Sequence, residues 1–76
     1  MRITLRSFGP LREVRGGRGV EDLDVPVGAS VGAVVAGLAL PAGLPVTCAV
    51  NESIVPRDTV LVDGDELALL PPVGGG

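Results

Sequence analysis

Hydrophobic and polar residues alternate in the first third of the chain. Within residues 1–8, apolar Ile3 and Leu5 alternate with polar or charged neighbours, and this period of two predicts a strand with one buried face. Gly9-Pro10 then interrupts the pattern. Apolar residues in the segment 20–27 predict a second strand that pairs with the first as a hairpin, and residues 11–14 between the two strands have room for one helical turn.

The spacing changes after residue 30. Ser30 is a favourable N-cap residue, and apolar residues follow at the i, i+3, i+4, i+7 spacing of one helix face: Val31, Val34, Val35 and Leu38. Pro41 ends this pattern. The sequence therefore predicts a helix that starts after Ser30 and packs this stripe against a sheet.

Three extended segments follow the helix. Residues 46–50 alternate again, residues 54–55 form a short apolar piece closed by Pro56, and Asp63-Gly64-Asp65 is a turn signal before the apolar run 66–70. The order is strand, strand, helix, strand, short strand, strand. It predicts an α+β fold of the β-grasp type, in which a mixed sheet of four to five strands packs on one helix. We expect the first and last strands to be parallel neighbours at its centre.

The last strand is apolar on both faces, although one helix covers only one face of a sheet. Leu67 and Leu69 would face one side, while Ala68 and Leu70 would face the other. If the first pair faces the helix, Leu70 lies exposed at the end of the domain and marks a docking surface. The alternative is that the segment 9–19 or 52–60 folds over this face.

The composition excludes several kinds of site. The chain of 76 residues is 46% hydrophobic, with Phe8 as its one aromatic residue, and it contains no histidine. A single cysteine, Cys48, rules out an internal disulfide, and its place between two valines of a strand predicts a buried apolar role. Without histidine we expect no metal site, and Asp63, Asp65 and Glu66 are better explained as a turn than as a cation site.

Charge is distributed unevenly along the chain. The net charge is −3, lysine is absent, and five of the six arginines lie in the first 18 residues. The run Arg15-Gly16-Gly17-Arg18-Gly19 has the composition of an RNA-binding segment, but an acidic chain without interleaved aromatic residues favours a solvated loop. We expect no nucleic-acid partner.

Residues 25–50 carry no charge, and this stretch is long enough for a membrane span. Prolines and glycines divide this stretch, however, so a helix and a strand joined by a loop explain it better. The N-terminal residues lack the apolar core of a signal peptide. We expect a cytoplasmic protein without a membrane partner.

The sequence ends in Pro71-Pro72-Val73-Gly74-Gly75-Gly76, and we expect a domain over residues 1–70 followed by a flexible tail over residues 71–76. Proline prevents the last strand from continuing and stiffens the base of the tail. Glycine has no side chain beside its acyl carbon, so a narrow active site can close around it. Glycine triplets also occur as frayed ends or cloning remnants, but the preceding domain makes the Gly76 carboxylate the candidate for chemistry.

Several motifs in the second half of the chain resemble the ubiquitin-like sulfur carriers. They are Val50-Asn51-Glu52, Asp58-Thr59, the turn and strand from Leu61 to Glu66, and the Pro-Pro-Val-x-Gly-Gly end. Upstream, Leu11-Arg12-Glu13 before a glycine loop and the helix start from Val25 to Val31 also fit. Within this family the chain most resembles the small subunit of molybdopterin synthase, the MoaD type. Gly74 stands at the family's variable position, and Leu69-Leu70 stand where bulkier aromatic residues are frequent.

The resemblance implies that an adenylating enzyme activates Gly76 with ATP and that a sulfur donor then converts it to a thiocarboxylate. The tail would deliver the sulfur into the active site of the large subunit of molybdopterin synthase, where a pterin precursor would receive it, in an expected heterotetramer. Leu70, Pro71, Pro72 and Val73 would contact the partners, with Gly74 and Gly75 leading to the reactive Gly76. The chain itself would bind no cofactor and hold no catalytic machinery of its own.

The sequence is also compatible with other functions. The chain could serve another sulfur pathway, such as thiazole formation, tRNA thiolation, cysteine synthesis or secondary metabolism. It could also be a ubiquitin-like protein modifier or a plain interaction domain.

Overall fold

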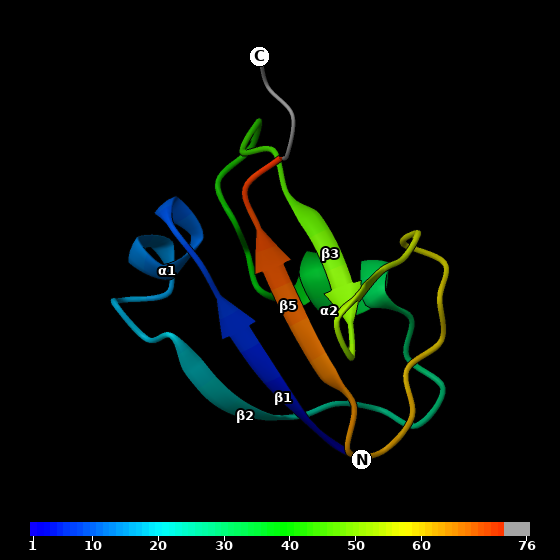
Figure 1. Cartoon of the computed structure of the whole chain (residues 1–76). Helices are drawn as coiled ribbons and strands as arrows, with labels where there is room; N and C mark the ends of the chain where they lie inside the picture. Colours follow the sequence, from blue (N-terminus) through cyan, green and yellow to red (C-terminus); the bar gives the residue numbers. More distant parts are fainter. Residues whose placement is uncertain (73–76) are drawn as a thin grey trace.

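The structure is a computed structural model that describes residues 1–72. It contains five strands, β1 (Arg2–Ser7), β2 (Val20–Asp24), β3 (Thr47–Val50), β4 (Ser53–Ile54) and β5 (Glu66–Leu70), and two helices, α1 (Pro10–Val14) and α2 (Val31–Gly37). The strands form one mixed sheet in the order β2-β1-β5-β3-β4. In Figure 1 the sheet faces the viewer and α2 lies behind it. The predicted β-grasp architecture is confirmed.

The centre of the sheet is the parallel pair of β1 and β5. Leu5 pairs with Leu67, and Ser7 pairs with Leu69, while β2 and β3 flank this pair in antiparallel directions. Ile3, Leu5, Leu67 and Leu69 are almost completely buried. These residues share one face because side chains alternate along a strand, so both central strands present apolar side chains to α2.

Helix α2 covers this face, as its apolar stripe predicts. Val31, Val34 and Val35 are buried, and Leu38, which caps the helix, is partly buried against the same core. The N–H groups of the first turn all have acceptors: Val31 N donates to Thr59 O at 2.9 Å and Gly32 N donates to Arg57 O at 2.8 Å. Ala33 N donates to the Ser30 hydroxyl at 3.1 Å. This complete capping fixes a helix of only seven residues.

The helical turn expected at residues 11–14 is confirmed as the helix α1, whose Leu11 is buried in the core. The extent of the second strand differs from the sequence expectation. Strand β2 ends at Asp24, whereas the alternation extended to Val27, which is exposed. Pro26 has no N–H to donate, and Gly28 has a φ of 85°, so the chain turns here instead of extending the strand.

The charge-free stretch 25–50 is divided among α2, β3 and the connections between them. Among residues 1–72, no helix is both long and apolar enough to span a membrane.

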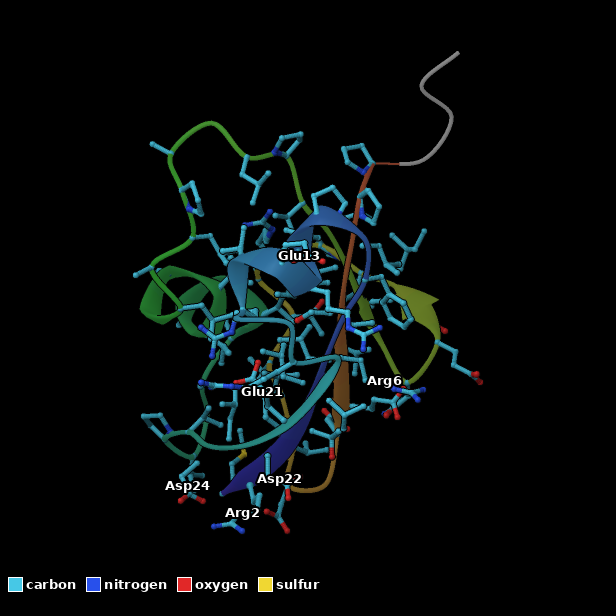
Figure 2. All side chains as sticks on the ribbon, turned by 90° about the vertical axis from the view of Figure 1, so that its left-hand side faces the viewer. Arg2, Arg6, Glu13, Glu21, Asp22 and Asp24 are labelled. Atoms are coloured by element: carbon cyan, nitrogen blue, oxygen red, sulfur yellow. The ribbon has the colours of Figure 1, made fainter. Side chains whose placement is uncertain are left out.

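The glycine loop that follows α1 is tied to β2 by an ion pair. Arg15 donates to both carboxylate oxygens of Glu21, with N–O distances of 3.0 and 2.8 Å, and Arg18 lies 3.4 Å from the same carboxylate. Glu21 is the cross-strand partner of Leu5 and therefore faces the core side of the sheet, where its side chain is only 9% exposed. Figure 2 shows it on the α2 side of the sheet, away from Arg6. The hydrogen bonds from Arg15 hold the pKa of Glu21 below its ordinary value.

We expect Glu21→Gln to lower the free energy of unfolding by about 1–3 kcal/mol at neutral pH, because it removes a charge-assisted, two-bond pair. A carboxylate with a depressed folded-state pKa stabilises the fold above its unfolded pKa of about 4.3. That contribution is lost as the pH falls through the folded-state value. Urea titrations should therefore show a gap between wild type and variant that is full at neutral pH and closes below about pH 4. Glu13→Gln, on the exposed side of α1, is the matched control; an equal effect there would contradict the assignment.

Candidate functional site

The tail leaves the domain at the end of the central strand β5. Leu69 is buried against the core, whereas Leu70 is partly buried on the opposite face of the sheet. Phe8 N donates to Leu69 O at 3.1 Å, and this bond ties the end of β1 to the end of β5. Pro71 then passes close to Gly9: a Cβ at Gly9 would lie 3.4 Å from Pro71 Cγ. Gly9 also has a φ of 58°, a conformation that favours glycine. Pro71, the first residue of the tail, therefore packs beside a position where glycine is preferred.

The face of the sheet opposite α2 is open. Neither of the two segments that the sequence offered as a cover lies over it, since Leu11 of the first packs into the core and β4 of the second extends the sheet at its edge. A shallow depression with a volume of about 330 Å³ follows this face. Its apolar floor consists of Phe8, Ala49, Ile54, Ala68 and Leu70. We call it the open-face groove.

The open-face groove exposes large apolar side chains beside the root of the tail. Phe8 is 43% exposed and Ile54 is 63% exposed. Three charged residues, Arg6, Glu52 and Glu66, complete its lining. An apolar floor with a charged edge is typical of a protein-binding surface, and this one leads directly to Pro71.

Comparison with known proteins identifies the family. The model of the family described as "ThiS family" matches residues 5–76. The chain belongs to the ThiS family. The match includes nearly the whole domain and extends through the C-terminal glycines, so the resemblance inferred from the motifs is confirmed.

The known proteins to which this ThiS-family chain is similar include a named relative and two solved structures. The molybdopterin synthase sulfur carrier subunit of Mycobacterium tuberculosis is 36% identical, over 100% of this chain and 99% of the relative. A complex of subunits 1 and 2 of the molybdopterin-converting factor from Helicobacter pylori contains a similar chain, with a TM-score of 0.67, 28% identity and full coverage of both chains. The small archaeal modifier protein 1 of H. volcanii has a TM-score of 0.76 and 25% identity, over 95% of this chain and 98% of the other.

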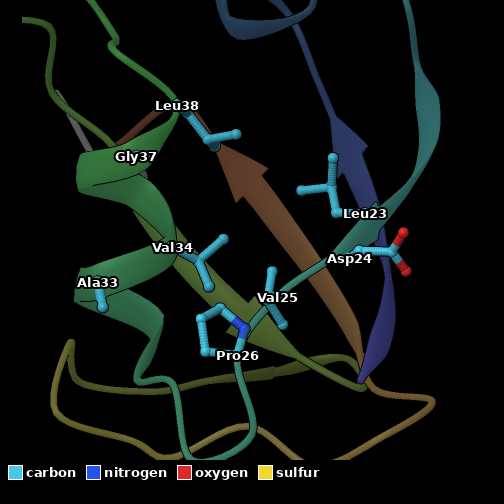
Figure 3. Close-up of a pocket in the computed structure, with 8 residues that line it drawn as sticks. All are labelled: Leu23, Asp24, Val25, Pro26, Ala33, Val34, Gly37 and Leu38. Atoms are coloured by element: carbon cyan, nitrogen blue, oxygen red, sulfur yellow. The ribbon is translucent and has the colours of Figure 1, made fainter.

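A second hollow, of about 280 Å³, lies between α2 and the edge strand β2 of this ThiS-family domain. Figure 3 shows Val34 and Leu38 on the helix side and Leu23 on the strand side. Its one charged lining residue, Asp24, forms an ion pair with Arg2 at 3.0 Å. This hollow offers no reactive group, and it lies on the helix side of the sheet, away from the open-face groove.

The remaining candidates for chemistry have structural roles. Cys48 is buried, and burial raises the pKa of its thiol, which keeps it in the unreactive protonated form. The Asp65 carboxylate accepts hydrogen bonds from Val62 N at 2.9 Å and Asn51 Nδ2 at 3.0 Å, while Asp63 accepts one from Arg2 N at 2.8 Å. These acids fix the turn before β5. Among residues 1–72, no group of three or more potential ligands could hold a metal ion.

Of the residues predicted for the site, Leu70, Pro71 and Pro72 lie within the described residues, whereas Val73, Gly74, Gly75 and Gly76 lie outside them. Their roles stay predictions. Sequence reasoning missed Phe8, Ile54 and Glu52. Phe8 carried a signal, since it is the one aromatic residue and lies in phase with the polar residues of β1. Ile54 and Glu52 join the groove only through the register of the β3–β4 hairpin.

Proposed function

We propose that this protein is a sulfur carrier whose Gly76 is converted to a C-terminal thiocarboxylate and donates its sulfur in molybdopterin synthesis. The observation that carries the proposal is the open-face groove, an apolar surface that ends at the root of a Pro-Pro-Val-Gly-Gly-Gly tail. The full-length similarity to the mycobacterial sulfur carrier subunit supports the choice of pathway.

The chemistry begins with an unreactive group. A C-terminal carboxyl has a pKa near 3.3–3.7, so it is an anion at neutral pH and a poor electrophile. An adenylating enzyme would activate Gly76: a carboxylate oxygen attacks the α-phosphorus of ATP, and pyrophosphate leaves. A sulfide-equivalent donor then attacks the acyl carbon, and AMP leaves. The product is a thiocarboxylate, a much stronger nucleophile that the tail carries to the acceptor.

The domain contributes placement in this scheme. The activating enzyme and the large synthase subunit would each bind the open-face groove and receive the tail in their own active sites. The Helicobacter pylori complex of subunits 1 and 2 supports a large-subunit partner. Pro71 and Pro72 would set the direction in which the tail leaves the surface, because proline restricts the backbone.

Intact-mass spectrometry tests the proposal. The purified chain is incubated with the adenylating enzyme of the same organism, magnesium ATP and sodium hydrosulfide. We expect a gain of about 16 Da, the replacement of one oxygen by sulfur, and we expect none when ATP is omitted. An unchanged mass in the complete reaction, with an enzyme shown to be active, would refute the sulfur-carrier function.

The second candidate is a protein modifier, which the similarity to the small archaeal modifier protein supports. In that case Gly76 would form an amide with an amine of a target protein. The sequence contains no lysine, so this chain offers no side-chain amine for self-extension. The same mass experiment on cell extracts separates the two functions, because conjugates appear at much higher mass than the thiocarboxylate.

A further inference from the structure

The turn between β3 and β4 places a charged residue in an unfavourable backbone conformation. Asn51 and Glu52 have φ values of 49° and 74°, and Val50 pairs with Ser53 across them. Two consecutive positive φ values correspond to a type I′ turn, in which glycine is the preferred second residue. Asparagine adopts this conformation readily, but a glutamate does so only with strain. Glycine at position 52 would remove that strain.

This turn is also held firmly to the central strand. Asn51 N donates to Glu66 O at 2.9 Å, and Glu66 N donates to Asn51 Oδ1 at 3.0 Å. The Asn51 amide donates in addition to Asp65 at 3.0 Å. The backbone of Glu52 is therefore fixed relative to β5 and to the groove that this strand lines.

The strained residue lines the open-face groove and is exposed. Of the other two charges at this edge, Arg6 and Glu66 pair with each other at 3.5 Å. Within residues 1–72, Glu52 takes part in none of the ion pairs. One positive and two negative charges leave the edge of the groove with a net charge of −1, centred on Glu52.

We propose that Glu52 is a recognition residue for the docking partner: its carboxylate is held at the edge of the open-face groove to pair with an arginine or lysine that lies beside the apolar segment of the protein docked there. The inference rests on the proposed function. The protein that occupies the open-face groove in this inference is the large synthase subunit. Charge complementarity is the argument, because an apolar floor with an unpaired anion fits an apolar segment flanked by a cation. A basic side chain can cover apolar surface with its stem while its charge reaches the carboxylate.

Two substitutions at position 52 distinguish the effect of the charge from the effect of the backbone strain. Glu52→Gln keeps the shape of the side chain and removes the charge, whereas Glu52→Gly removes both the charge and the strain. Binding of each variant to the large subunit of molybdopterin synthase from the same organism is measured by calorimetry, and the Tm of each free chain is recorded. Glu13→Gln is the charge-matched control on α1, and Leu70→Ala is the positive control in the groove floor.

We expect Glu52→Gln to raise the Kd by about threefold to fivefold in low salt, the effect of one exposed ion pair. The difference should vanish near 1 M salt, where the Debye length is about 3 Å. Glu52→Gly should weaken binding to the same extent while raising the Tm by about 4 °C or more. A residue with only a structural role would not improve stability and impair binding together. Leu70→Ala should weaken binding at both salt concentrations, and Glu13→Gln should change neither readout.

The controls separate failure of this inference from failure of the function. If Leu70→Ala weakens binding while Glu52→Gln binds like wild type in low salt, the role of Glu52 is refuted and the carrier function stands. If the wild-type chain does not bind the large subunit, the proposed synthase function fails, and the role of Glu52 fails with it. A lower Tm for Glu52→Gly would overturn the argument that position 52 is strained.

Discussion

Val35→Asp is expected to lower the free energy of unfolding by about 3–5 kcal/mol, the usual effect of an unpaired buried charge. Val35 lies on the apolar stripe of α2 and is only 8% exposed. Val35 belongs to the hydrophobic core cluster, whose buried members are all apolar. Because total stabilities of small domains are about 5–15 kcal/mol, the variant should be largely unfolded at moderate temperature. Circular dichroism during thermal and urea denaturation measures the effect.

The same helix offers a matched control. Ala36 is the next residue along α2, and it is exposed. We expect Ala36→Asp to change stability by no more than about 1 kcal/mol, from helix propensity and the unfavourable interaction with the helix C-terminus. Comparable losses in both variants would show that any aspartate in α2 is disruptive, and near-normal stability of Val35→Asp would contradict the assigned core face.

The sequence predicted this core because the signals involved are local and periodic. The spacing from Val31 to Leu38 requires only that a helix forms, and Ser30 together with Pro41 limits it. The outward placement of Leu70 followed from counting faces, since one helix covers one side of a sheet and Leu67 and Leu69 occupy that side. These inferences need no knowledge of which distant residues pair.

The composition of the groove could not be predicted in the same way. Ile54 lies beside Ala49 only because a two-residue turn joins β3 and β4, and a shift by one residue would turn it to the other face. The strain at Glu52 depends on backbone angles that its side chain disfavours, so local preference indicates the wrong conformation there. The three bonds that Asn51 makes to residues 65 and 66 fix that turn from a distant part of the chain.

The burial of the ionised Glu21 on the core side of β2 is a second feature that the hydrophobic pattern does not explain. Glu21 is in phase with Leu23 and so lies on the same face of β2, where it pairs with Leu5 of β1, although a glutamate is rarely buried. Its burial is possible because Arg15, six residues earlier, folds back from the glycine loop and pairs with it. A pattern of hydrophobicity does not record which charges neutralise each other in space, so such a pair emerges only from the structure.

Deleting Gly76 is expected to abolish sulfur transfer while leaving the domain intact. Residues 1–72, which contain the core and the open-face groove, are unchanged by the deletion, so the Tm and the affinity for the large subunit should stay close to those of wild type. The terminal carboxylate would lie about 3.5 Å short of its position in the partner's active site. Since a misplacement of about 1 Å can reduce a rate by about 100-fold, we expect at least that loss. A reconstituted assay with the activating enzyme, the large subunit and the pterin substrate measures it.

Two further variants show whether the terminal glycine itself is required. One additional alanine after Gly76 places the glycine carbonyl in a peptide bond, which leaves no carboxylate at that position to adenylate, so transfer should again be lost. Gly74→Ala keeps the length of the tail and adds a methyl group at the position that the sulfur-carrier pattern leaves variable, so transfer should persist at near the wild-type rate. Normal transfer by the chain that lacks Gly76 would eliminate the proposed thiocarboxylate. Loss of transfer in Gly74→Ala would instead show that the partner channel admits no side chain at position 74.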